Sequence, residues 1–206
     1  MLRILGRVTS INVRKLLWAA DELGVAYERE DWGLPLRDPH DPEFVKLNPN
    51  ALVPVLVDDE FVLWESHAII RYLAERGGGT LIPSELEARA LMDQWMTWQL
   101  TELGPSWRYA FLALGRPTPG FDDQSQIARS IGNWSDRMRI LDAQLTRLGP
   151  YIVGDSLTLA DIALGVAIHR WVMTPFDKPA LPAAMAYYEA LRARPAAAPY
   201  LGEKTP

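Results

Sequence analysis

The chain of 206 residues contains no cysteine. This absence excludes disulfide bonds, thiolate metal sites, iron–sulfur clusters and any mechanism in which the enzyme uses its own cysteine as the nucleophile. Histidine is scarce as well, since the sequence holds only His40, His67 and His169. Their positions lack the short pairwise spacing that is typical of metal ligands. We therefore expect no catalytic metal.

Long apolar runs and a strong excess of one charge are also missing. No run reaches the roughly 18 residues that a membrane-spanning helix needs, and the N-terminus lacks the pattern of a signal peptide. The 21 basic and 26 acidic side chains give a net charge of −5. This balance argues against a nucleic-acid or membrane partner. Because 49% of the residues are hydrophobic and 23% are charged, we expect a folded globular protein of the cytoplasm.

The first part of the sequence mixes the period of strands with the period of helices. Short apolar or alternating runs predict strands at 2–5, 27–32, 53–57 and 61–64. Helical spacing predicts helices at 13–23, 43–47 and 66–75. The order is strand, helix, strand, an irregular proline-rich segment, then strand, strand, helix. We therefore expect an α/β domain at residues 1–78.

The rest of the sequence is helical in period. Glycines at 77–79 interrupt the first pattern, and we place a linker at 79–85. Helices are predicted at 87–114, 123–148, 158–171 and 182–192, the first of them interrupted near Gly104 and Pro105. An all-helical second domain is therefore expected at 86–206.

A helix start stands out at residues 154–161, GDSLTLAD, just before the apolar run 162–168. Thr158 can cap the helix, and the Asp161 carboxylate can accept a hydrogen bond from the Thr158 main-chain amide. A carboxylate that binds a ligand is the functional alternative. We interpret Asp161 instead as part of a buried helix cap that stabilises the second domain.

Further motifs precede this cap, namely TSINVRK at 9–15, NPNALVPVL at 48–56 and WESHAI at 64–69. With these motifs in this order, the chain resembles the cytosolic glutathione transferases, in particular bacterial theta-like, serine-type members, over nearly its whole length. The resemblance implies a thioredoxin-like α/β N-terminal domain, an all-α C-terminal domain and a homodimer. It also implies an enzyme that conjugates the glutathione thiolate to small apolar electrophiles, with glutathione as co-substrate and no other cofactor.

Two motifs then supply a glutathione site. The pattern alone leaves Val53–Pro54 as either a cis turn or an ordinary trans strand start, and the resemblance implies the cis form, with glutathione pairing to Val53 like an added strand. Ser66 can cap a helix whose free amides favour an anion. The resemblance implies that the γ-glutamyl carboxylate docks there and that Glu65 holds the ammonium group. A plain helix cap with an acidic neighbour is the alternative.

The remaining site residues follow from the resemblance. His40 or Lys46 meets the glycyl carboxylate of glutathione. Ser10 stands where the family keeps its thiol-activating group, so its hydroxyl is expected to donate to the thiolate; Asn12 is the alternative donor.

For the electrophile, the resemblance points to the long helix after the linker. We assign Trp107, Arg108 and Phe111 to its pocket, although aromatic residues at helical spacing are more often core. Two alternatives to conjugation stay open. One is glutathione-dependent reduction of peroxides or disulfides on the same site. The other is a non-catalytic, transferase-like module that mediates protein association.

Overall fold

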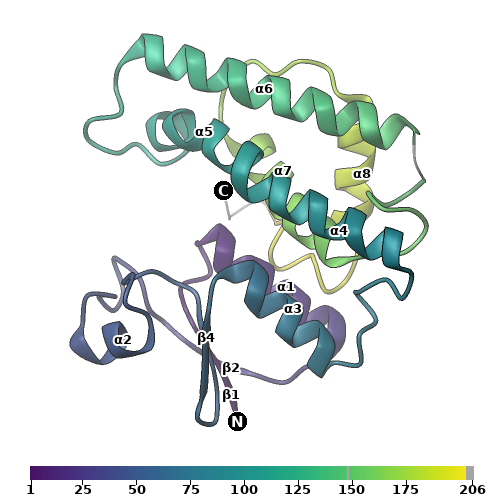
Figure 1. Ribbon diagram of the computed structural model, residues 1–206. Coiled ribbons are helices and arrows are strands. Elements are labelled where there is room, and N and C mark those ends of the chain that lie inside the picture. The colour runs from purple at the N-terminus through teal and green to yellow at the C-terminus, as the bar shows by residue number, and fades with distance from the viewer. Residues whose placement is uncertain (148, 203–206) are drawn as a thin grey trace. The chain divides into compact units, whose positions relative to one another are not determined.

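The computed structural model describes residues 1–147 and 149–202. Contacts within the chain define two compact units (Figure 1), the first spanning Met1–Ile82 and the second beginning at Pro83. Each unit is described by itself. The end of the helix predicted at 123–148 includes Leu148, which lies outside the described residues.

The first unit contains a four-stranded sheet with the order β2-β1-β3-β4. Its strands are β1 (Leu2–Leu5), β2 (Glu28–Glu30), β3 (Val55–Asp58) and β4 (Phe61–Trp64). Strands β1 and β2 are parallel, so a crossover joins them, and α1 (Ile11–Leu23) supplies it. Strand β3 is antiparallel to both β1 and β4. This arrangement confirms the predicted thioredoxin-like α/β fold.

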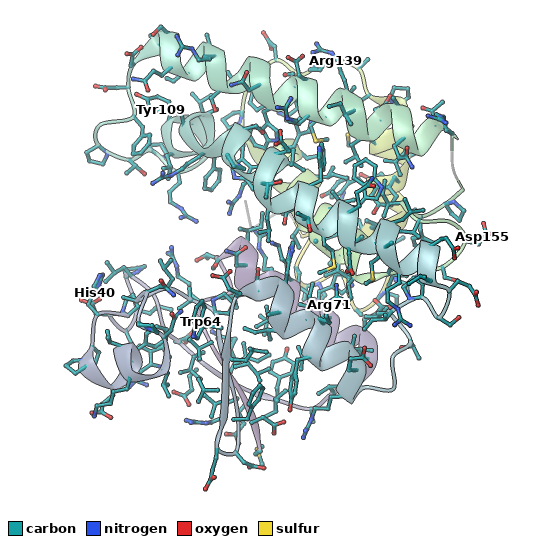
Figure 2. The ribbon with its side chains drawn as sticks, in the orientation of Figure 1. His40, Trp64, Arg71, Tyr109, Arg139 and Asp155 are labelled. Atoms are coloured by element: carbon teal, nitrogen blue, oxygen red, sulfur yellow. The ribbon has the colours of Figure 1, made fainter. Side chains whose placement is uncertain are left out.

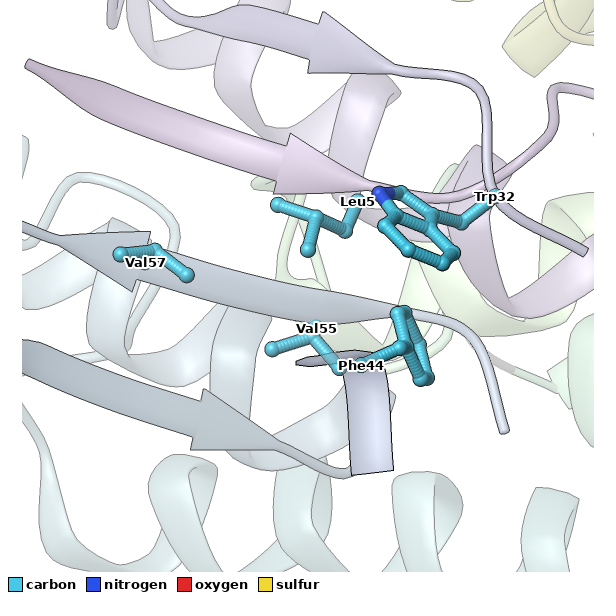
Figure 3. Close-up of a cluster of buried hydrophobic side chains, with 5 residues drawn as sticks. All are labelled: Leu5, Trp32, Phe44, Val55 and Val57. Atoms are coloured by element: carbon cyan, nitrogen blue, oxygen red, sulfur yellow. The ribbon is translucent and has the colours of Figure 1, made fainter. Parts of the chain in front are cut away.

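Helices cover both faces of this sheet. α1 and α3 (Ser66–Arg76) lie together on one face, and α2 (Pro42–Leu47) lies on the other (Figure 1). Because side chains alternate along a strand, Val55 and Val57 point toward α2. There they pack with Leu5, Trp32 and Phe44 in one buried cluster (Figure 3).

The second predicted strand is shorter than expected. The sequence predicts it over 27–32, but β2 ends at Glu30. Trp32 leaves the strand, buries its indole 4.8 Å from the Phe44 ring and carries the Arg37 guanidinium 3.8 Å from its own ring. Burial of this large ring therefore ends the strand, because apolar area removed from water outweighs the remaining ladder hydrogen bonds.

The second unit is helical throughout its described regular elements, as predicted. It comprises α4 (Leu86–Trp98), the π-helical turn η1 (Gln99–Leu103), α5 (Gly104–Ala110), the π-helical turn η2 (Phe111–Gly115), α6 (Gln124–Arg147), α7 (Leu159–Met173) and α8 (Pro182–Arg192). The interruption expected near Gly104 begins earlier, as a change from α to π geometry. Pro105 lies in the first turn of α5, where its missing N–H costs little.

The predicted capping box at the start of α7 is confirmed. Asp161 is fully buried and accepts hydrogen bonds from the Thr158 amide at 2.7 Å and the Thr158 hydroxyl at 2.8 Å. The Ile152 amide at 2.9 Å and the Tyr187 hydroxyl at 2.7 Å bond the other carboxylate oxygen. Burial raises the pKa of Asp161, although these donors favour the ionised form. Asp161 thus ties α7, α8 and the loop before α7 together.

Candidate functional site

The start of α1 leaves a hydroxyl group available. Ser10 is the N-cap residue, with extended backbone angles, and its carbonyl accepts the Arg14 amide at 3.0 Å. Its side chain makes no capping hydrogen bond. This geometry leaves the hydroxyl free to serve a ligand.

A small cavity of about 60 Å³ lies in the first unit. Residues from separate segments line it, namely Asn12, Asn48, Asn50, Leu52, Val53, Pro54, Glu65 and Ser66. The start of α1, the loop before β3 and the start of α3 therefore meet at one place. Of the predicted glutathione-site residues, this cavity gathers Asn12, Val53, Pro54, Glu65 and Ser66; Ser10 does not line it.

Asn48 organises the loop that leads into the cavity. Its Oδ1 atom accepts from the Asn50 amide at 3.0 Å and from Asn50 Nδ2 at 2.9 Å, while its Nδ2 donates to the Leu52 carbonyl at 2.7 Å. Its side chain is buried. Neither asparagine is among the site residues predicted from the sequence. The signal was present in the motif at 48–56, since asparagine side chains commonly form turns by bonding nearby main chain.

The segment after this loop offers free main-chain groups. The Val53–Pro54 peptide bond is cis, as predicted. Among the described residues, the amide and carbonyl of Val53 have no hydrogen-bond partner. Val53 lies just before β3 and lines the cavity. An extended, peptide-like ligand can therefore bond to it as an added strand does.

The start of α3 differs by one residue from the expectation. The prediction of Ser66 as the N-cap is wrong, because Glu65 occupies that position and Ser66 is the first helical residue. Glu65 has φ of 73° and ψ of 113°, a sparsely populated region that costs about 1–3 kcal/mol. Its side chain makes no capping bond, so the first amides of α3 are not capped by it and favour an anion at the cavity.

His40 and Lys46, the candidates for the glycyl carboxylate, do not line the cavity. Both are exposed, and Figure 2 shows His40 in the loop beside α2. His40 Nδ1 lies 3.0 Å from an Asp38 oxygen, and hydrogen bonds from the His40 main chain and ring hold the pKa of Asp38 below its usual value. Lys46 Nζ donates to Glu43 at 2.6 Å. Exposed pairs of this kind are weak and readily exchange partners.

The candidates for the electrophile pocket separate into two groups. Trp107 and Phe111 are buried, with only 6% and 3% of their surface exposed, and the Arg170 guanidinium lies 3.9 Å from the Phe111 ring. Trp107 packs on Trp134 at 5.6 Å. Arg108 is exposed and lines a larger cavity of the second unit. Burial thus gives the two aromatic residues a packing role in this unit.

No group of three or more His, Cys, Asp or Glu side chains among residues 1–147 and 149–202 is arranged to hold a metal ion. In the same residues, no helix has both the length and the apolar character needed to cross a membrane.

Family models match both parts of the chain. The model described as "Glutathione S-transferase, N-terminal domain" matches residues 2–75, which contain the cavity residues above. The model described as "Glutathione S-transferase, C-terminal domain" matches residues 124–190, which include all of α6 and α7 and most of α8.

Individual relatives cover almost the full length. The chain is 34% identical over 199 residues to glutathione S-transferase GstB of Escherichia coli, covering 95% of each chain. It is also similar to the theta class glutathione S-transferase of Xanthomonas axonopodis pv. citri, solved with glutathione bound, with 38% identity, a TM-score of 0.92 and coverage of 97% and 96%. A glutathione S-transferase from Pseudomonas fluorescens follows with 28% identity, a TM-score of 0.84 and coverage of 95% and 96%.

Proposed function

Because the chain belongs to the glutathione S-transferase family and is a glutathione transferase, we propose that it joins the glutathione thiolate to small apolar electrophiles. The observation that carries this proposal is the cavity of the first unit. It combines the unpaired main chain of Val53, the uncapped start of α3 and the amide side chain of Asn12. We further propose that it works as a homodimer in the cytoplasm, where the glutathione pool is kept largely in the thiol form.

Glutathione is a tripeptide with two carboxylates, one ammonium group and one thiol, and each group has a proposed partner. Val53 bonds the peptide main chain, and the first amides of α3 with Ser66 receive the γ-glutamyl carboxylate. Glu65 holds the ammonium group. His40 or Lys46 turns from its acidic neighbour to the glycyl carboxylate. On this assignment residues 1–78 are the glutathione-binding domain, 79–85 the linker and 86–206 the helical domain.

The thiol of the bound glutathione is the nucleophile, because the chain has no cysteine of its own. Ser10 donates a hydrogen bond to the sulfur, and the positive end of α1 adds to its stabilisation. Trp107, Arg108 and Phe111 of the second unit are the proposed contacts of the electrophile. Of these residues Arg108 is the exposed one and offers the most direct contact.

A panel of co-substrates tests the reaction. An aryl halide, an epoxide, an organic hydroperoxide and a mixed disulfide of glutathione are each assayed with the purified enzyme and glutathione. We expect turnover with the aryl halide or the epoxide. Turnover with only the hydroperoxide or the disulfide would replace conjugation by the reductive alternative, for which the position of Asn12 in the cavity is the favouring observation.

Ser66→Ala tests the carboxylate anchor. Ser66 is buried at the first position of α3, so its hydroxyl is proposed to donate directly to a charged oxygen. We expect glutathione binding to weaken about tenfold, as for loss of a hydrogen bond to a charged group. Titration calorimetry measures this affinity, and Ser84→Ala, in an exposed segment, serves as the control. An unchanged affinity in Ser66→Ala would remove Ser66 from the site.

The proposed homodimer is tested by mass. Helix α4 and the π turn η1 expose Leu86, Leu91 and Leu100, which are 75%, 41% and 42% accessible. We propose that these exposed leucines contribute to the contact with a second copy of the chain. Light scattering at micromolar protein should give twice the chain mass of 23.2 kDa. Leu100→Asp should shift the protein toward monomer, while Leu34→Asp, in a loop of the first unit, should not. A monomer mass for the unaltered protein would contradict the proposal.

A further inference from the structure

A buried lysine of α1 meets the start of α3. Lys15 is completely buried, and its Nζ atom lies 3.1 Å from the Nε2 atom of His67, 52 residues farther along the chain. The two helices lie together on one face of the sheet (Figure 1), so this contact joins neighbouring elements. Burial of an ion is costly unless polar groups surround it. His67 therefore contributes to holding the Lys15 ammonium group in place.

The chemistry of the two side chains fixes the direction of this hydrogen bond. A lysine ammonium group can only donate, so the Nε2 atom of His67 accepts and the ring proton resides on Nδ1. This is the neutral form of imidazole. His67 is the second residue of α3, where the positive end of the helix also disfavours a charged ring. The positive charge of the pair is therefore carried by Lys15.

Both members of the pair are close in the chain to residues of the first-unit cavity. His67 directly follows Ser66, the proposed anchor of the γ-glutamyl carboxylate, and Lys15 lies one helical turn after Asn12, on the same face of α1. Lys15 and His67 themselves do not line the cavity. The pair thus connects the starts of the two helices that form the cavity, without touching the place where a ligand is expected.

A positive charge at this place favours an anion at the start of α3. Two charges interact more strongly in the protein interior than across water, and dissolved ions screen buried charges less than exposed ones. Lys15 is shielded from water, and the first amides of α3 already favour an anion. The charge of Lys15 and the amides of α3 therefore act on a bound carboxylate with the same sign.

From these contacts we propose that Lys15 is a positioning residue for glutathione. Through its bond to His67 it fixes the first turn of α3, and its charge strengthens the binding of the γ-glutamyl carboxylate at Ser66. This inference rests on the glutathione site proposed above and adds to it a residue that does not contact glutathione. It requires a cation at position 15 and a hydrogen-bond acceptor at position 67.

Lys15→Met tests the charge, because methionine fills similar space without an ammonium group. We expect the affinity for glutathione, measured by titration calorimetry, to fall about tenfold. The pKa of the bound thiol, read from ultraviolet absorbance, should not change, since Ser10 and Asn12 are both kept. A second probe is glutathione in which a carboxamide replaces the γ-glutamyl α-carboxylate. Lys15→Met should weaken this uncharged analogue by about twofold at most, because it gains little from a nearby cation.

His67→Gln and His67→Leu form a matched pair that tests the hydrogen bond. Glutamine places an oxygen acceptor near the position of Nε2, so His67→Gln should keep the affinity for glutathione. Leucine has no acceptor, so His67→Leu should weaken glutathione about tenfold. Because His67 is only partly buried, this pair decides the proposal even if Lys15→Met fails to fold.

Arg3→Met is the control for loss of a positive charge from the first unit. Arg3 is partly exposed on β1 and pairs with Glu30 at 2.6 Å, so its replacement should leave the affinity for glutathione unchanged. The inference is overturned if Lys15→Met binds glutathione normally, if it weakens the carboxamide analogue as much as glutathione, or if His67→Gln is as weak as His67→Leu. Failure of the unaltered protein to bind glutathione would instead overturn the proposed function, and this inference with it.

Discussion

Replacing Asp161 by alanine is expected to lower the free energy of unfolding by about 3–5 kcal/mol, the largest stability change we anticipate for one residue. Its carboxylate is fully buried and accepts bonds from Ile152, from both donors of Thr158 and from Tyr187. Alanine leaves all of these donors without a partner, and each buried unpaired group costs about 1–3 kcal/mol. Partial rearrangement keeps the total below the simple sum.

Urea unfolding followed by tryptophan fluorescence measures this change. Asp155→Ala, an exposed position in the same loop (Figure 2), should alter stability by no more than about 0.5 kcal/mol. Asp161→Asn keeps the size of the side chain, so its loss of unfolding free energy should lie between those of Asp161→Ala and Asp155→Ala. Activity per folded molecule should stay near normal in all three variants. A stable but inactive Asp161→Ala protein would show that the residue is catalytic and the structural interpretation wrong.

Replacing Ser10 by alanine is expected to raise the pKa of the bound glutathione thiol by about one to two units. A free thiol titrates near 8.5, and lowering that value to about 6.5 takes about 2.7 kcal/mol of preferential thiolate stabilisation. A charge-assisted hydrogen bond supplies about 1.5–3 kcal/mol, and the positive end of α1 adds about 0.3–1 kcal/mol. The Ser10 hydroxyl is suited to this role because it makes no bond to the first turn of its own helix.

Because the thiol pKa is raised, the loss of conjugation rate in Ser10→Ala should depend on pH. A raised thiol pKa leaves less thiolate at neutral pH, so Ser10→Ala should conjugate about tenfold more slowly there. The deficit should shrink as the pH rises through the new pKa, where the variant thiol also ionises. Ultraviolet absorbance of the enzyme–glutathione complex, titrated with base, reads the thiolate directly.

Asn12→Ala distinguishes the two donors at the start of α1. We expect Asn12→Ala to raise the pKa of the bound thiol less than Ser10→Ala does. Ser156→Ala changes an exposed loop position and, as the control, should leave this pKa unchanged. If Asn12→Ala moves the titration and Ser10→Ala does not, the activating donor is Asn12. The cavity that Asn12 lines would then support the reductive alternative over conjugation.

The sequence by itself determined the architecture of both units, because local patterns govern it. The short apolar runs of β3 and β4, the apolar spacing in α1 and α3 and the box formed by Thr158 and Asp161 each depend on neighbours close in the chain. The end of β2 is the exception. It was set by Trp32, whose partner Phe44 comes from α2, beyond the reach of a local pattern.

Only the tertiary structure decided which side chains meet. Asn48 and Asn50 line the cavity of the first unit because hydrogen bonds fix the conformation of their loop. The motif at 48–56 does not by itself predict that conformation. Trp107 and Arg108 are neighbours in sequence, yet one is buried and the other lines an open cavity, since successive helical residues point in directions about 100° apart. Ser130 of α6 bonds the main chain of α5 at Ser106 and Ala110. Such contacts join residues distant in sequence, so their formation depends on packing rather than on local propensity.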